Sequence, residues 1–140
     1  MKKTFSLLAA LVLGFAGVAA SAHASPILQA HVPFDFTVSS STFSAGDYTF
    51  SKLSENIWTI RNDKTKQAIS ALVTSFGTNQ DQNPAKLVFK HAGSSYFLYE
   101  VHSLGETSVA PPSKTERSME REMARNRTKP ESIYVLASAR

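Results

Sequence analysis

The stretch KLVFKHAGSSYFLYEVHS, residues 86–103, decides the fold. Two runs rich in Val, Leu, Phe and Tyr, 86–91 and 95–103, flank the short segment AGSS (92–95), whose residues favour a turn. This pattern predicts an antiparallel β-hairpin. Pairing of His91 with Tyr96 beside the turn then sets the register, which gives the pairs Phe89 with Leu98 and Leu87 with Glu100.

Both faces of this hairpin are largely apolar. The face opposite Phe89 carries Val88, Phe97, Tyr99 and Val101. A hairpin with only one buried face shows polar residues in alternation with apolar ones, so we expect this hairpin to lie at the centre of the domain.

Short runs with a period of two residues recur from Val32 onward, and turn residues break them at close intervals. They predict further strands near 32–38, 47–53, 57–61, 67–75 and 132–137. The polar segment GTNQDQNPA (77–85) is expected to be a mobile surface loop.

The character of the chain changes after APPS (110–113). Ser113 and Glu116 form a capping-box signature, and KTERSMEREMAR (114–125) consists mainly of good helix formers, which predicts a helix over 113–126. The sequence therefore predicts a single all-β domain, a small antiparallel sandwich or partly open barrel of about seven strands, with one α-helix in its C-terminal region.

Residues 1–24, MKKTFSLLAALVLGFAGVAASAHA, show the three zones of a secretory signal peptide: two lysines, an apolar run, and small residues before the cleavage site. We expect cleavage after Ala24, or after Ala22 as the alternative, and one β-rich domain at 25–140. The apolar run is shorter than the roughly 20 residues that span a bilayer. We therefore expect an exported protein, periplasmic or extracellular, without stable membrane insertion after cleavage.

Charge and cysteine content exclude several classes of protein. The chain has no cysteine, so it has neither a disulfide framework nor a lipid-modified cysteine. It has 15 basic and 11 acidic residues, and loss of residues 1–24 removes two lysines and no acid. Because nucleic-acid-binding domains usually carry a clustered basic footprint, we expect no nucleic-acid partner.

The stretch HVPFDFTV (31–38) places Asp35 between two phenylalanines. Strand alternation turns the phenylalanines inward, so we expect Asp35 to be solvated or to cap a neighbouring backbone group. Pro33 lacks an N–H, which favours a strand that lies at a sheet edge or begins there.

No pattern in the sequence indicates a metal site or a cofactor site. The histidines His31, His91 and His102 do not converge in the expected register, and a metal site needs three or four ligands around one ion. Nucleophile-elbow, P-loop and dinucleotide motifs are missing. We therefore expect no metal, no cofactor and no catalytic residue.

Four aromatic residues are candidates for lining a ligand groove, because aromatic side chains stack on sugars and small apolar molecules. They are Tyr48, Trp58, Tyr96 and Tyr99. The alternative is that they belong to the hydrophobic core of a domain without disulfides.

The expected helix carries Arg117, Arg121 and Arg125 at intervals of four residues. Like charges at this spacing repel by a few tenths of a kcal/mol, which is unusual in a helix that serves stability alone. Met119 and Met123 form one apolar stripe, which predicts a surface helix docked on the β-domain. We interpret the arginine row as a candidate contact for an anionic glycan, a lipid headgroup or a protein partner.

A series of short motifs resembles a family of small exported proteins of unknown function that is abundant in acidobacteria. The motifs are VPFDFTV (32–38), AGDY (45–48), KLVF (86–89), YFL (96–98) and PSKTER (112–117). Ser44 and Ala92 stand where such proteins tend to have a proline and an aromatic residue. The resemblance implies a bacterial, exported, β-rich domain, and it assigns no activity, cofactor or functional residue.

The sequence favours an exported, non-enzymatic accessory or binding protein. One alternative is a hydrolase of cell-wall or soil polysaccharide, which requires at least two of Asp35, Asp47, Glu100 and His102 to meet in a pocket. The other is a cell-surface structural or assembly component that exposes a strand edge, for which the Pro33 strand is the candidate.

Overall fold

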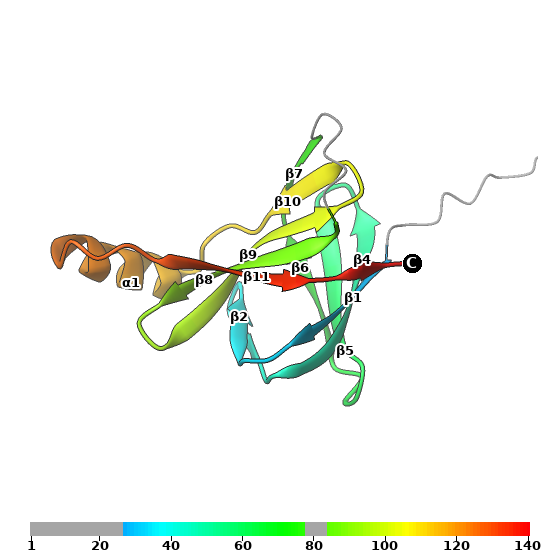
Figure 1. Ribbon diagram of the computed structural model, residues 1–140, viewed down its shortest axis with the longest axis horizontal. Coiled ribbons are helices and arrows are strands. Elements are labelled where there is room, and N and C mark those ends of the chain that lie inside the picture. The colour runs from blue at the N-terminus through cyan, green and yellow to red at the C-terminus, as the bar shows by residue number, and fades with distance from the viewer. Residues whose placement is uncertain (1–26, 78–83) are drawn as a thin grey trace, which may run out of the picture.

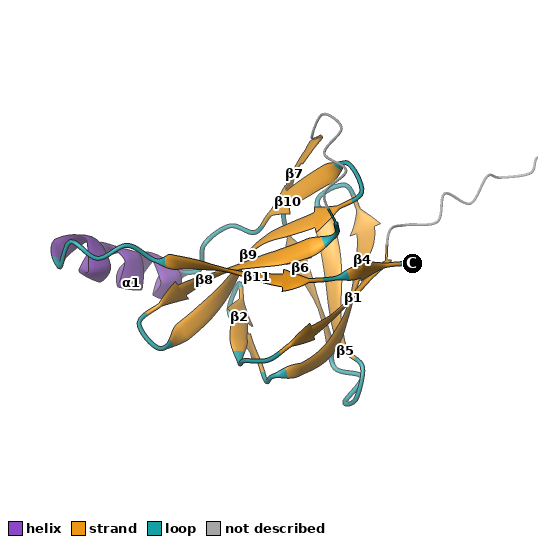
Figure 2. Ribbon diagram, viewed as in Figure 1, coloured by secondary structure: helices purple, strands orange, loops and turns teal. Residues whose placement is uncertain are grey.

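The structure, a computed structural model, describes residues 27–77 and 84–140. In these residues the chain forms twelve β-strands and one α-helix (Figures 1 and 2). The predicted signal peptide (1–24) lies outside the described residues, as does most of the predicted loop at 77–85. No helix within the described ranges is long and apolar enough to cross a membrane.

The strands form two sheets with antiparallel neighbours, apart from one parallel contact between β2 and β9. The first sheet contains, in spatial order, β12 (Ser138–Ala139), β1 (Ile27–Val32), β4 (Gly46–Ser54), β5 (Ile57–Asn62) and β6 (Ala68–Leu72). The second contains β11 (Glu131–Leu136), β8 (Lys86–Ala92), β9 (Ser95–Ser103), β10 (Glu106–Val109) and β7 (Thr74–Gly77), extended by β2 (Phe36–Val38) and β3 (Ser41–Phe43). The predicted all-β class with one helix is confirmed, and the two sheets do not close into a barrel.

The described chain passes from one sheet to the other four times, and two of these crossings are single residues. Only Val73 separates β6 from β7, and only Ala137 separates β11 from β12. Val73 is buried, and the Ala137 N–H donates to the Ala85 carbonyl at 2.9 Å. Strands that switch sheets in this way form the corners of packed sheets, so continuous chain joins the two sheets at these residues.

The core lies between the sheets and is rich in aromatic residues. The Phe36 ring lies 5.2, 5.1 and 5.3 Å from the rings of Phe43, Tyr48 and Phe89, respectively. Aromatic pairs at such distances contribute about 0.5–1.5 kcal/mol each beyond the burial of their area. Trp58 belongs to the same buried cluster.

The central hairpin is β8–β9, as predicted, and its register is confirmed up to the pair Phe89 with Leu98. Beyond that pair the register shifts, because Val88 pairs with Glu100 and leaves Tyr99 as an extra residue. The predicted pair Leu87 with Glu100 is therefore wrong, and Leu87 pairs with Val101. Such a bulge moves the following side chains of one strand to the other face, which here buries Val101 beside Leu87 in the core.

The stretch 31–38 is not one continuous strand. β1 ends at Val32, and β2 begins at Phe36. The predicted alternation holds, since Phe36 is buried, and Asp35 is exposed and accepts a hydrogen bond from the Ala45 N–H at 2.8 Å. The expectation of an edge strand at Pro33 is wrong, because β1 lies between β12 and β4, and β2 lies between β3 and β9.

The structure has more strands than the sequence pattern predicts. The predicted strands 32–38 and 67–75 each divide in two, and the short strands β3, β10 and β12 have two to four residues each. Segments this short hold too few apolar residues to show a period of two. Pairing with neighbouring strands determines them instead: β3 pairs with β2, β10 pairs with β9 and β7, and β12 pairs with β1.

A buried hydrogen bond joins the two sheets. Trp58 and Ser108 have no exposed surface, and the Trp58 indole Nε1 donates to Ser108 Oγ at 2.9 Å. Ser75 Oγ lies 3.0 Å from Ser108 Oγ and donates to the Glu55 carbonyl at 2.6 Å. The chain of hydrogen bonds satisfies the indole N–H at a position that water does not reach.

We expect Ser108→Ala to lower the free energy of unfolding by about 1–3 kcal/mol, because the buried indole N–H loses its acceptor. Urea denaturation followed by the fluorescence of the single tryptophan measures this change. Ser70→Ala is the control, since Ser70 is exposed and its Oγ lies 3.5 Å from Thr59 Oγ1. An equal effect of the two substitutions would contradict the role assigned to Ser108.

Candidate functional site

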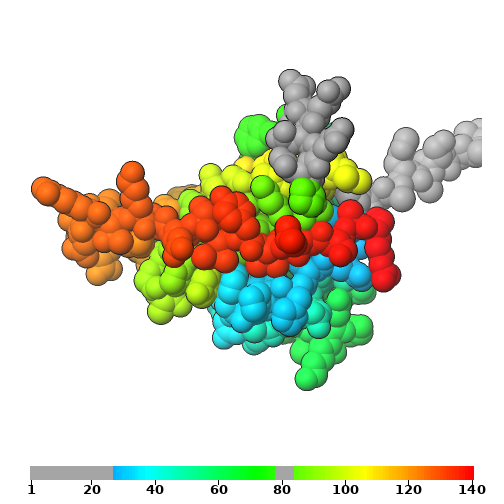
Figure 3. Space-filling view, in the orientation of Figure 1, coloured from blue at the N-terminus to red at the C-terminus, as the bar shows by residue number. Residues whose placement is uncertain are grey.

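The helix α1 (Lys114–Arg125) begins and ends close to the predicted boundaries of 113–126. Ser113 is its N-cap, and Ser113 Oγ accepts a hydrogen bond from the Glu116 N–H at 3.1 Å. The helix extends from one end of the domain, and the space-filling view shows it as a protrusion (Figures 1 and 3). Its position makes α1 the most prominent surface feature of the described chain.

The inner face of α1 rests on the β8–β9 hairpin. Met119 and Met123 are partly buried there, as the predicted apolar stripe requires. Gly93, in the hairpin turn, has a φ of +64°, and a Cβ at this position would lie 3.2 Å from Met119 Cε. Glycine is therefore favoured both by the backbone conformation and by the close approach of the helix.

Lys90 of β8 connects the hairpin to the two carboxylates on the inner face of the helix. Lys90 Nζ lies 2.9 Å from Glu120 Oε1 and 3.7 Å from Glu116 Oε1, and it sits 4.1 Å from the centre of the Tyr99 ring. Glu116 is only 4% exposed. A carboxylate this buried needs a nearby cation, and Lys90 supplies it.

The environment shifts the pKa values of this cluster. Burial raises the pKa of Glu116 above its usual 4.5, and the negative charge of Glu120 adds to this rise, although Lys90 opposes it. Burial alone would lower the pKa of Lys90, but the hydrogen bond to Glu120 and the attraction of both carboxylates outweigh it, so the pKa is raised above 10.5. Lys90 therefore stays charged at neutral pH.

The outer face of α1 carries the arginine row, which we define as Arg117, Arg121 and Arg125. All three side chains are exposed. Within residues 27–77 and 84–140, none of them lies within 4.0 Å of a carboxylate in an ion pair. The helix thus turns two of its three acids, Glu116 and Glu120, toward Lys90, and its three arginines are exposed to solvent together with Glu122.

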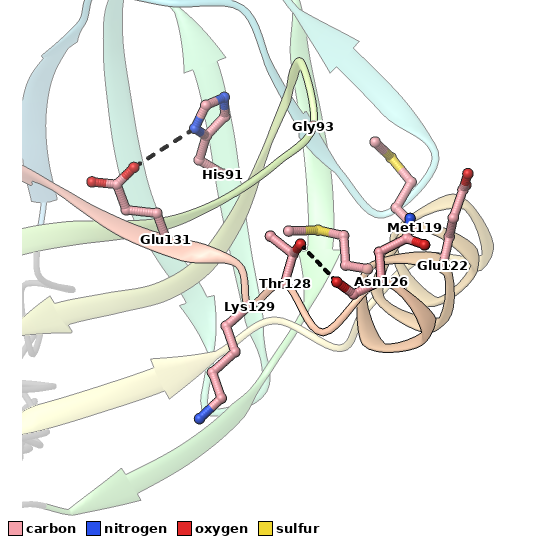
Figure 4. A pocket seen from close by; sticks show the side chains of 9 residues that line it. His91, Gly93, Met119, Glu122, Asn126, Thr128, Lys129 and Glu131 are labelled. Carbon is pink, nitrogen blue, oxygen red and sulfur yellow. Dashed lines mark hydrogen bonds and ion pairs between the residues drawn. The ribbon is translucent and has the colours of Figure 1, made fainter.

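A groove of about 500 Å³, the methionine groove, separates α1 from the hairpin turn and the start of β11 (Figure 4). Met119 and Met123 line its helix side, and His91 and Glu131 line the other, with 4.0 Å between His91 Nδ1 and Glu131 Oε2. Glu122 also lines the groove, so its walls combine apolar surface with two carboxylates.

A second groove, the hydroxyl groove, has a volume of about 790 Å³ and lies between the β2–β3 hairpin and residues 111–117. Seven of its lining residues carry hydroxyl groups, and Lys114 and Arg117 are its charged residues. Pro111 and Pro112 add apolar surface. Arg117 belongs both to this groove and to the arginine row, so the two surfaces are continuous.

The four aromatic residues proposed for a ligand groove do not meet at one site. Tyr48 and Trp58 are buried in the core, as the alternative interpretation expected. Tyr96 stacks between Phe34 and the His91 ring, whereas Tyr99 lies under Lys90.

The carboxylates considered for a hydrolase are bound to different partners. Asp35 accepts from the Ala45 N–H, and Asp47 Oδ1 lies 2.8 Å from the Nδ1 of exposed His31. No cluster of three metal-ligating residues occurs in the described residues.

Glu100 and His102 do make contact, with 2.7 Å between Glu100 Oε2 and His102 Nε2. Thr107 Oγ1 lies 3.2 Å from His102 Nδ1, so the imidazole has a partner on each side. These residues line neither the methionine groove nor the hydroxyl groove. The arrangement fixes the orientation of the ring on the surface of the second sheet.

Sequence reasoning missed both grooves. The hydroxyl groove combines segments 37–42, 95–97 and 111–117, and no local motif links three segments so far apart. The capping box and the prolines before it were the only local signals near it. Comparison with known proteins gave no match to a protein-family model, to a curated protein or to a solved structure. The function is therefore inferred from the site itself.

We expect Lys90→Met to lower the free energy of unfolding by about 1–3 kcal/mol, because Glu116 loses its cation while the aliphatic packing is retained. Urea denaturation and hydrogen exchange in 114–125 measure the loss. Combining Lys90→Met with Glu116→Gln and Glu120→Gln is expected to recover most of the stability. If the combined variant is as unstable as Lys90→Met, the electrostatic explanation is wrong.

We also expect Glu116 to make stability depend on pH in a defined direction. The folded protein holds the Glu116 proton to a higher pH than the unfolded chain, so the contribution of this group falls as pH rises above about 4.5. The free energy of unfolding of the wild type, minus that of Glu116→Gln, should decrease as the pH rises above about 4.5 and should level off once Glu116 is ionised in the folded protein as well. A difference that does not change as the pH rises from 4.5 would show that folding does not raise the pKa of Glu116.

Proposed function

We propose that the protein is an exported, non-enzymatic binding protein that holds an anionic partner along the arginine row. Export rests on the sequence pattern of residues 1–24. The binding role rests on one observation, the separation of charge on α1: Glu116 and Glu120 face Lys90, and the arginines have no carboxylate partner among the described residues.

The energetics of the helix support this proposal. Neighbouring arginines of the row lie four residues apart and repel each other by a few tenths of a kcal/mol. All three side chains are exposed, so they gain no stability from burial. A helix whose sole role was to cover the hairpin would need particular residues on its inner face only. Guanidinium groups bind carboxylates and phosphates through parallel hydrogen bonds, so an anionic partner would use the row that the fold leaves free.

The two alternatives have less support. The Glu100–His102 pair lines neither the methionine groove nor the hydroxyl groove, so neither groove supports a hydrolase site at this pair. An assembly role would need a free edge at the Pro33 strand, and β1 and β2 have neighbours on both sides.

We expect the triple variant Arg117→Ala, Arg121→Ala and Arg125→Ala to elute from a carboxylated matrix at clearly lower salt than the wild type. Alanine favours the helix, so circular dichroism should show an unchanged fold. The control is Arg61→Ala, Lys64→Ala and Arg140→Ala, which removes three exposed charges on the first sheet and at the C-terminus. Equal retention of the two triple variants would overturn the proposal, because net charge alone would then explain binding.

A further inference from the structure

We propose that the hydroxyl groove binds the sugar units of an acidic polysaccharide, whose further charges lie along the arginine row. This inference rests on the proposed function, and it names the ligand class of the same surface. It assigns the groove to sugar rings and their hydroxyl groups, and the arginines to the carboxylates of the chain.

The polar groups of the hydroxyl groove are available to a ligand. Among the described residues, the hydroxyls of Ser39, Ser40, Ser95 and Thr115 have no hydrogen-bond partner, whereas that of Ser113 accepts the capping bond. Hydroxyl groups both donate and accept, which matches the hydroxyl groups of a sugar. The volume of about 790 Å³ lies within the range of small-molecule sites.

The charge of the hydroxyl groove selects for an anion. Lys114 and Arg117 are its charged lining residues, and no Asp or Glu is among the residues that line it. Three other grooves in the described chain each contain a pair of carboxylates. These pairs are Glu122 and Glu131, Asp47 and Asp63, and Glu55 and Glu106. The hydroxyl groove therefore differs from these three grooves, because an anionic ligand in it meets no lining carboxylate.

The geometry of the surface favours a linear polymer over a single small anion. Arg117 lines the groove, and Arg121 and Arg125 follow at steps of about 6 Å along the helix axis, since each residue rises 1.5 Å. A chain with repeated carboxylates contacts the arginines in turn while one of its ends occupies the groove. Repeated weak contacts on one molecule raise its overall affinity.

A membrane surface fits the same features less well. Helices that lie on membranes insert large apolar side chains from one face. The apolar residues of α1 that are partly buried, Met119 and Met123, face the hairpin, and the exposed large apolar residues of the described chain lie outside α1 and the groove. A polyphosphate would accept hydrogen bonds from the arginines and from the hydroxyl groups, but it has no carbon skeleton to pack on the prolines of the groove and no sugar hydroxyl groups to donate to the Ser and Thr oxygens.

The test measures binding of the domain at 25–140 by calorimetry to three polymers. Polygalacturonate has both sugar and charge, its methyl ester has the same sugar chain without charge, and polyphosphate has charge without sugar. Vesicles that contain phosphatidylglycerol form a fourth arm. We expect polygalacturonate to bind most tightly, the methyl ester to bind at least about tenfold more weakly, and polyphosphate to bind in between.

Two substitutions place a carboxylate in the groove and leave all three arginines of the row unchanged. Thr115→Glu acts from the helix side, where an acid in the first turn favours the helix, and Thr42→Glu acts from exposed Thr42 of β3. Ser118→Glu is the matched control, because exposed Ser118 lies on the same helix close to Arg117 and Arg121 but does not line the groove. Ser118→Glu therefore adds a negative charge beside the arginine row and leaves the hydroxyl groove open.

We expect both groove substitutions to weaken polygalacturonate binding at least about tenfold more than Ser118→Glu, and to change polyphosphate binding no more than Ser118→Glu does. If the groove variants match the control while the triple arginine variant loses binding, the groove assignment is wrong and the proposed function stands. Binding to vesicles but not to polygalacturonate also overturns the groove assignment. If the wild type binds none of the four anionic and neutral ligands, the proposed function fails as well.

Discussion

The β8–β9 hairpin has apolar residues on both faces, and the rest of the structure follows from the need to cover both. Leu87, Phe89 and Val101 belong to the core between the sheets. On the opposite face, Val88 and Phe97 are equally buried but lie outside that core cluster. The first sheet covers one face, and residues 110–117 with α1 cover much of the other, which is why a β-sandwich carries a helix at this place.

The second face of the hairpin also determines the charge pattern of the helix. Lys90 lies on that face and cannot reach the solvent freely once the helix covers it. Two carboxylates on the inner face of α1, Glu116 and Glu120, compensate its charge, so two of the three acids of the helix turn inward. The arginines at the intervening positions are exposed and have no carboxylate partner in residues 27–77 and 84–140. The surface that we assign to binding is in this sense a consequence of how the hairpin is covered.

Local patterns in the sequence predicted the secondary-structure elements. They did not predict the features that depend on contacts between distant segments. The alternation around Asp35, the turn at Gly93 and the cap at Ser113 each depend on a few neighbouring residues, so the sequence indicated them correctly. The bulge at Tyr99 depends on pairing between two strands, and it reversed the face of Val101. The arginine row could be read from its spacing alone, whereas the groove beside it arises from three distant segments.

The two walls of the hydroxyl groove differ in how firmly they are held. One wall is the β2–β3 hairpin, which pairs with β9 in the second sheet, and the other is the segment that leads into α1. The helix is attached through one face, so its local opening requires less free energy than unfolding of the sheets. A ligand that contacts both walls binds only the docked helix and stabilises it by mass action. If the groove binds a ligand as we propose, this coupling is reciprocal, and Lys90 would then act as a positioning residue for the groove through its contacts with the inner face of the helix.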